Sequence, residues 1–206
     1  MEVIDLKLHD LPHLTDNYVV AIGFFDGLHL GHQKLIEEVK RVSVKKNYKS
    51  AVMTFDQHPL VVLKGEERRY LTSSLDRDRI LEKLGIETLF VIHFSSEVAS
   101  LSPEDFIAQY IIGLHIKHVV VGFDFHFGNK NSGDVHSLEG HGFELSVVPP
   151  VMYDEKVKVS STLIKSLLHS GHIRDANKLL TRDYAITGEV IHGKARGRLI
   201  GFPTAN

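Results

Sequence analysis

Short apolar runs alternate with amphipathic segments along most of the chain. Five apolar runs, most of them rich in β-branched residues, each predict a buried strand: residues 18–22, 51–55, 88–92, 118–122 and 143–148. In residues 33–46 the apolar side chains recur at helical spacing among lysines and glutamates: Leu35, Ile36, Val39 and Val42. Strands that alternate with helices of this length predict an α/β fold with a five-stranded parallel sheet covered on both faces.

Helix-start signals lie between the later runs. Ser73 or Ser74 caps one predicted helix, and Ser102 followed by proline and two acidic residues begins another that ends near Gly113. The Ser-Ser-Thr at residues 160–162 caps a helix through about residue 170, and a short helix over residues 176–180 follows. From Tyr184 the pattern changes to one typical of a separate β-rich module, which the chain does not continue far enough to close.

Composition narrows the possible classes of function. Of 206 residues, 43% are hydrophobic and 24% are charged, which is typical of a globular protein. The absence of cysteine excludes disulfides and thiolate metal sites and fits a cytoplasmic location. We expect no signal peptide, no membrane span and, with a net charge of -2, no nucleic-acid partner. Oligomeric state is not readable from the sequence.

The first candidate site joins the first predicted strand to the first predicted helix, at residues 23–32. Gly23 and Gly27 permit a tight turn and a close approach to a ligand, and Gly31 keeps the helix start uncrowded. His29 and His32, three residues apart at a helix N-terminus, form an anion site suited to a polyphosphate. A turn with two solvated histidines is the alternative, which the glycines and the strand–helix context disfavour. No Walker-type phosphate loop occurs in the sequence.

Two further segments follow the same logic. After the fourth apolar run, Asp124 lies among the phenylalanines of residues 123–127. For the phenylalanine rings alone, packing in the core is the alternative to a binding site. The carboxylate of Asp124 is harder to explain in this way, because a carboxylate in an apolar setting needs a partner. At the helix start after residue 160, Ser161, Thr162 and Lys165 can all face a phosphate, with a plain helix cap as the alternative. Residues 54–59 end the second predicted strand on the same rim, so the candidates converge.

Together these segments resemble the N-terminal FMN adenylyltransferase module of the bacterial bifunctional riboflavin kinase/FAD synthetase family, over about residues 15–206. The family pattern Gly-x-Phe-Asp-Gly-x-His-x-Gly-His is matched at seven positions: Gly23, Phe25, Asp26, Gly27, His29, Gly31 and His32. Residues 54–59, 101–104, 121–128 and 160–162 match in order. Three residues depart from the family pattern: Phe24 stands where the family often has asparagine, Gln57 where it has proline, and Lys165 where arginine is usual. Lysine keeps the positive charge of arginine but lacks its two-pronged guanidinium.

The resemblance implies a Rossmann-like nucleotidyltransferase domain over residues 1–182, followed over residues 183–206 by the start of a riboflavin kinase β-barrel too short for kinase activity. It implies that ATP, with Mg²⁺, adenylates FMN to give FAD and pyrophosphate; the sequence assigns no metal ligand. The catalytic candidates are His29, His32, Asp124, Ser161, Thr162 and Lys165. The candidates for binding the substrates are Gly23, Phe24, Phe25, Asp26, Gly27, Gly31, Phe55, His58, Pro59, Phe125 and Phe127, with Phe55, His58, Phe125 and Phe127 assigned to the flavin side.

Two rival functions remain. One is a nucleotidyltransferase with another acceptor, such as phosphopantetheine or glycerol phosphate, against which the order and spacing of the Asp124 and Ser161 segments argue. The other is a non-catalytic flavin or nucleotide sensor, which Lys165 and the short kinase-like segment mildly favour.

Overall fold

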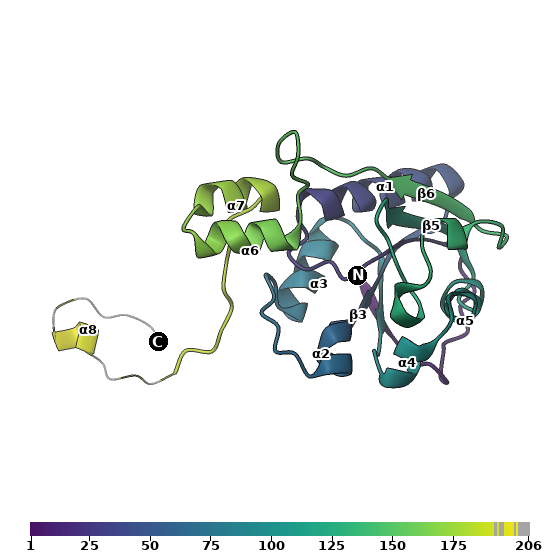
Figure 1. The fold of residues 1–206 in the computed structure, drawn as a ribbon, viewed down its shortest axis with the longest axis horizontal. Helices are drawn as coiled ribbons and strands as arrows, with labels where there is room; N and C mark the ends of the chain where they lie inside the picture. Colours follow the sequence, from purple (N-terminus) through teal and green to yellow (C-terminus); the bar gives the residue numbers. More distant parts are fainter. Residues whose placement is uncertain (192, 194–195, 200, 202–206) are drawn as a thin grey trace.

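The computed structural model describes residues 1–191, 193, 196–199 and 201. Its centre is a parallel sheet with the strand order β1-β4-β3-β2-β5-β6 (Figure 1). The strands are β1 (Glu2–Leu6), β2 (Tyr18–Ile22), β3 (Lys49–Phe55), β4 (Thr88–Ile92), β5 (Ile116–Gly122) and β6 (Glu144–Val148). All five predicted strands are therefore confirmed, within a sheet of six.

The prediction of five strands was wrong because it omitted β1, which pairs in parallel with β4 at one edge of the sheet. Glu2 and Asp5 interrupt its apolar residues, and Val3 is 50% exposed. A half-exposed edge strand has no continuous apolar run, so only its pairing with β4 identifies it as a strand.

Helices cover both faces of the sheet. They are α1 (Leu30–Lys46), α2 (Pro59–Lys64), α3 (Ser74–Lys83), α4 (Ser96–Ser100), α5 (Pro103–Phe106), α6 (Ser161–His169), α7 (Ile173–Leu180) and α8 (Arg196–Leu199). A π-helix (Ile107–Ile112) continues α5 to the predicted end, and two short 3₁₀ helices lie at Asn129–Asn131 and His136–Leu138. Ser73, Ser102 and Ser160 are the N-caps of α3, α5 and α6, as the sequence predicted.

Alternate residues of the strands build two cores. In β2, Val19 and Ala21 pack with the apolar faces of α1 and α3, whereas Val20 and Ile22 pack with α4, α5 and the π-helix. A third, smaller cluster joins α6 to α7, which lie side by side at one end of the sheet beside the start of α1 (Figure 1). This small cluster brings the start of α6 next to the loop that precedes α1.

The strand order creates a switch point between β2 and β5. From β2 the chain moves through β3 to β4, and it then returns to place β5 and β6 on the other side of β2. The connections leave the carboxyl ends of β2 and β5 in opposite directions, which opens a crevice where ligands bind in open parallel sheets. Gly23 follows β2 and Phe123 follows β5, so the first two candidate sites meet at this crevice.

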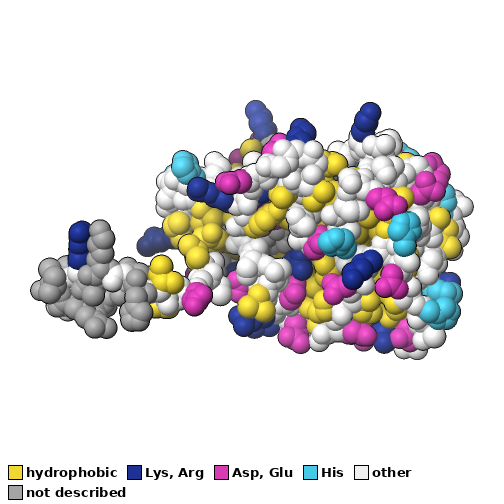
Figure 2. Space-filling view, turned by 90° about the horizontal axis from the view of Figure 1, so that it is seen from below, with side chains coloured by type: hydrophobic (Ala, Val, Ile, Leu, Met, Phe, Trp, Pro, Cys, Tyr) yellow, Lys and Arg dark blue, Asp and Glu magenta, His cyan; other side chains and the backbone are white. Residues whose placement is uncertain are grey.

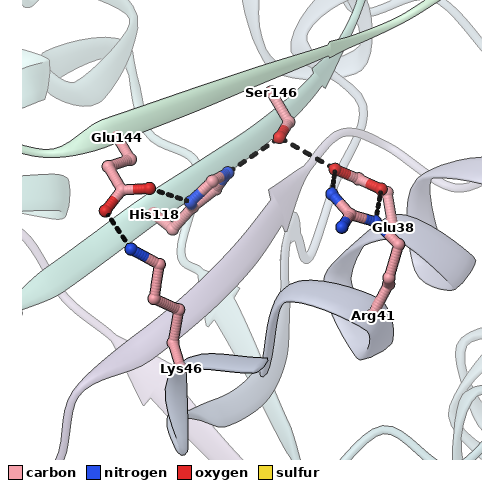
Figure 3. Close-up of polar contacts among 6 residues, drawn as sticks. All are labelled: Glu38, Arg41, Lys46, His118, Glu144 and Ser146. Carbon is pink, nitrogen blue, oxygen red and sulfur yellow. Dashed lines mark hydrogen bonds and ion pairs between the residues drawn. The ribbon is translucent and has the colours of Figure 1, made fainter. Parts of the chain in front are cut away.

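A chain of polar contacts joins α1 to β5 and β6 through six side chains (Figure 3): Glu38, Arg41, Lys46, His118, Glu144 and Ser146. The Ser146 hydroxyl donates to Glu38 over 3.0 Å and lies 2.8 Å from Nε2 of the buried His118. Because the hydroxyl proton goes to Glu38, the serine oxygen accepts from His118, whose Nε2 carries the hydrogen. The contacts tie the first helix to the far edge of the sheet.

On the face seen in Figure 2, acidic and basic side chains are interspersed with apolar ones. None of the helices in the described part of the chain is long and apolar enough to cross a membrane.

The predicted barrel fragment does not appear. No strand forms among the described residues that follow α7, where α8 is the one regular element. A strand needs a neighbouring strand to pair with, and the sheet of the described residues consists of β1 to β6. The last part of the predicted kinase-like segment, residues 202–206, lies outside the described residues.

Candidate active site

A cavity of about 880 Å³ opens at the switch point, between the ends of β2, β3 and β5 and the start of α6. Thirteen of the predicted site residues line it: Gly23, Phe24, His29, Gly31, His32, Phe55, His58, Pro59, Asp124, Phe125, Phe127, Ser161 and Thr162. Four others lie outside its wall: Phe25, Asp26, Gly27 and Lys165. The structure therefore brings together segments separated by more than a hundred residues.

His29 and His32 form one stacked unit at the start of α1. His29 is the N-cap of the helix, and its Nδ1 accepts the backbone N–H of His32 over 3.4 Å. The two rings stack with centroids 3.8 Å apart and planes inclined by 17°. Because Nδ1 of His29 is an acceptor, the hydrogen of its neutral ring sits on Nε2.

Both histidines are held in the neutral form. Burial lowers the pKa of His29 to about 4. Burial, with the adjacent His29 ring as a second cause, lowers the pKa of His32 well below its usual value. Nδ1 of His32 is also shielded from solvent and has no hydrogen-bond partner among the described residues. At neutral pH the pair therefore offers N–H donors to an anion without carrying charge.

The turn before the helix is fixed from beneath the cavity. Phe25 is fully buried, with its ring centroid 5.1 Å from that of His32. The Asp26 carboxylate accepts the backbone N–H of Leu71 over 2.7 Å and pairs with Lys165 over 2.6 Å. The Ser161 hydroxyl donates to the Asp26 carbonyl over 2.7 Å. In this arrangement Asp26, Ser161 and Lys165 hold the turn, while Thr162 is exposed toward the cavity.

Gly27 is required by the conformation of the same turn. Its φ is 86°, and a Cβ at this position would lie 2.7 Å from Cδ1 of Leu71. The sequence-based argument for glycine at this position is therefore correct, although the backbone approaches another part of the protein rather than the cavity.

Aromatic rings form a further part of the cavity wall. Phe55 meets Phe94 edge to face at 5.4 Å, and Phe125 stacks on Phe127 at 5.5 Å. Phe24 meets the ring of His58 at 4.9 Å. These rings supply an apolar surface suited to a flat aromatic ligand.

His58 and Pro59 begin α2 at the edge of this wall. His58 is the N-cap, its Nδ1 accepts from Leu60 over 3.2 Å, and Pro59 occupies the first helical turn. Nε2 of His58 lies 3.2 Å from Arg68. Burial, followed by the charges of Arg68 and Lys165, lowers the pKa of His58. Because Nδ1 is the acceptor, the hydrogen of the neutral His58 ring sits on Nε2, which faces another donor in Arg68 and remains available to an acceptor such as a ligand oxygen.

Asp124 differs from its predicted surroundings. The sequence placed this carboxylate in an apolar setting, but its side chain is 51% exposed because the residue lies in the open turn after β5. The partner that the sequence required exists: Lys158 pairs with the carboxylate and lies over the ring of Phe123 at 5.1 Å from its centroid. Lys158 lines the cavity and was missed because an isolated lysine in a loop carries no local signal.

No group of three or more histidine, cysteine, aspartate or glutamate side chains suited to a metal ion occurs in the described part of the chain. Asp124 is a carboxylate on the cavity wall. One carboxylate together with phosphate oxygens is a common environment for Mg²⁺ that arrives with a nucleotide, so Asp124 fits such an ion.

Comparisons with known proteins show what this chain is similar to. The family model described as FAD synthetase matches residues 11–163, and the model described as riboflavin kinase matches residues 180–206. The chain is 42% identical over 195 residues to the bifunctional riboflavin kinase/FMN adenylyltransferase of Listeria monocytogenes, covering 92% of this chain and 62% of that protein. It is 34% identical to a FAD synthetase of the same organism, covering 87% and 74% of the two chains.

Two solved structures extend the comparison. A crystal structure named as a macrolide-efflux protein from Streptococcus pneumoniae shares 37% identity and a TM-score of 0.88, over 100% of this chain and 68% of that one. A pantoate-beta-alanine ligase from Francisella tularensis shares 14% identity and a TM-score of 0.55, over 89% and 80% of the two chains. The second likeness shows the fold alone.

Proposed function

The chain belongs to the FAD synthetase family, and from this premise we propose that it transfers the adenylyl group of ATP to the phosphate of FMN, giving FAD and pyrophosphate. The observation that carries the proposal is that the stacked, neutral pair His29 and His32 lines the same cavity as a group of aromatic rings. One part of such a cavity suits a triphosphate and another suits a flavin.

In the proposed reaction an FMN phosphate oxygen attacks the α-phosphorus of ATP in line, and the bond to the leaving pyrophosphate breaks. No side chain acts as a nucleophile, so the protein contributes position and charge stabilisation. His29 and His32 donate N–H groups to the triphosphate, with the N-terminus of α1 behind them. The hydroxyl of Thr162, at the start of α6, contacts the departing phosphates from the other side.

The flavin occupies the aromatic side in this proposal. Phe55, Phe125 and Phe127 pack against the ring system, and His58 and Pro59 border it at the start of α2. Apolar burial of a flat ring favours FMN over an acceptor such as phosphopantetheine or glycerol phosphate, which carries no aromatic ring.

Mg²⁺ bound to the triphosphate offsets its negative charge, and Asp124 is the residue of the chain that would hold the ion. To hold the ion, the Asp124 carboxylate would have to leave its contact with Lys158, whose ammonium group would then be available to a phosphate oxygen.

We assign the transferase to residues 1–182 and the first part of a riboflavin kinase module to residues 183–206. The chain spans 62% of the length of the bifunctional relative from Listeria monocytogenes, and the proposal includes no kinase activity for these 206 residues. A cytoplasmic location belongs to the same proposal.

The test is to incubate the protein with FMN, ATP and Mg²⁺ and to separate the flavins. FAD together with pyrophosphate is the expected result, whereas bound but unchanged FMN would indicate a sensor and overturn the proposal. His32→Ala should lower FAD formation roughly hundredfold or more, because donors aimed at transition-state charge are worth that much. His141→Ala, which changes an exposed histidine outside the cavity, is the matched control. Near-normal turnover of folded His32→Ala would remove the histidine pair from the mechanism.

A further inference from the structure

The turn that precedes α1 has a strained backbone. Leu28 has a φ of 46° and Phe25 a φ of 56°, which are left-handed values unusual for residues other than glycine. Such a conformation persists only where the surroundings impose it. The Gly27 N–H donates to the Thr72 hydroxyl over 2.7 Å, and the Leu28 carbonyl accepts from Gln33 over 2.9 Å.

Another polar group of this turn, the Gly27 carbonyl, is bound by Arg182, which lies 155 residues further along the chain. Nη2 of Arg182 donates to it over 2.7 Å, and Nη1 donates to the Leu180 carbonyl over 3.1 Å. Among the described residues, no carboxylate lies within 4.0 Å of the guanidinium. Burial lowers the pKa of Arg182, with the charge of Asp76 acting in the opposite direction, but a guanidinium stays charged in a protein. The half-buried positive charge of Arg182 is thus directed at two backbone carbonyls, of which that of Gly27 belongs to the turn.

The segment that carries Arg182 is itself anchored. Gln33, at the start of α1, donates to the Thr181 hydroxyl over 2.7 Å and to the Leu180 carbonyl over 3.3 Å. Just beyond Arg182, the Tyr184 N–H donates to Asn177 of α7 over 2.9 Å. The guanidinium therefore reaches Gly27 from a fixed support on both sides.

We propose that Arg182 is a positioning residue of the nucleotide site, which holds the Gly27–Leu28 peptide so that His29 points at the phosphates of ATP. The charge-assisted hydrogen bond fixes the plane of this peptide. Without it, Gly27 is free to change its φ, Leu28 relaxes to the right-handed region, and His29 leaves the N-cap position from which it meets the ligand. The inference rests on the proposed function, because it describes how that site is held.

Arg182 also acts on His29 through its charge. Burial is the main cause of the low pKa of His29; the charge of Arg182 lowers it further, and that of Asp26 raises it. His32, stacked on His29, is neutral, and Lys165 pairs with Asp26. Removing the guanidinium takes this contribution away, so we expect the pKa of His29 to rise in Arg182→Ala.

The experiment compares Arg182→Ala, Arg182→Gln and Arg182→Lys with the wild-type protein. Arg174→Ala, which removes an exposed arginine of the neighbouring helix α7, is the matched control. For Arg182→Ala we expect the KM for ATP to rise roughly tenfold to a hundredfold, because a hydrogen bond from a charged donor is lost, with the KM for FMN unchanged. Lysine restores part of the affinity, and NMR titration shows a raised His29 pKa in the alanine and glutamine variants.

A wild-type KM for ATP in folded Arg182→Ala would overturn the inference. Equal increases in the KM for ATP and the KM for FMN, together with a loss of stability that Arg182→Lys does not restore, would overturn it as well. If the alanine variant does not fold, the glutamine and lysine variants decide. If the wild-type protein makes no FAD, the proposed function fails, and calorimetric titration with ATP alone still compares the wild-type and Arg182 proteins.

Discussion

Replacing Gly31 with alanine separates the stability of the protein from the geometry of its nucleotide site. Gly31 lies in the first turn of α1, where its backbone is helical and alanine is permitted. Alanine in a helix is favoured over glycine by roughly 0.5–1 kcal/mol, so the variant should unfold at the same temperature as the wild type or slightly above.

The added methyl group nevertheless meets the ring of His29. Its Cβ would lie 3.2 Å from both Cε1 and Nδ1, so the ring has to shift by a few tenths of an ångström. The ring stacks on His32 at 3.8 Å, and His32 in turn faces Phe25 at 5.1 Å, so a shift of the His29 ring disturbs the stacked pair. Since a misplacement of ~1 Å costs ~100-fold in rate, we expect kcat/KM for ATP to fall roughly tenfold.

The assay is the rate of FAD formation against ATP concentration, with thermal unfolding measured on the same samples. Gly188→Ala is the matched control, because no atom lies within 4 Å of the Cβ that it would add. Wild-type kcat/KM in a Gly31→Ala protein of unchanged stability would show that the position of the His29 ring does not matter. A loss of activity that merely follows a loss of stability would refute the reasoning equally.

Two further predictions concern stability. Because the pKa of His29 is lowered from 6.5 to about 4, the unfolded chain binds a proton in this interval that the folded chain does not. The free energy of unfolding should therefore fall as the pH falls from about 6.5 to about 4. Urea unfolding at several pH values measures this slope, which should be smaller in His29→Gln. A wild-type protein whose stability does not change over this pH range would contradict the prediction. Ser146→Ala removes the link between His118 and Glu38 (Figure 3) and should cost about 1–2 kcal/mol in urea unfolding without changing FAD formation; unchanged stability would show that the link contributes nothing.

The parts of this protein that depend on local pattern were predictable from sequence. The apolar run at residues 18–22 predicted a buried strand, and all five residues of β2 are buried. The Ser-Ser-Thr at residues 160–162 predicted a helix start, and Ser160 is the N-cap of α6. The motif around His29 and His32 indicated a helix N-terminus facing an anion, and the structure has both rings at the start of α1 on the cavity wall. Burial and capping depend on residues a few positions apart, which a sequence displays directly.

Contacts between remote segments were decided by the tertiary structure alone. Asp26 looked like a ligand contact, but α6 brings Lys165 to its carboxylate, 139 residues away in the chain. Arg182 reaches the carbonyl of Gly27 across 155 residues, and a carbonyl carries no residue-specific signal. β1 is a strand because β4 lies beside it. The sequence by itself thus indicated the segments that meet at the cavity, whereas the packing of α6 and of the segment after α7 decided which of their residues line it and which hold the turn in place.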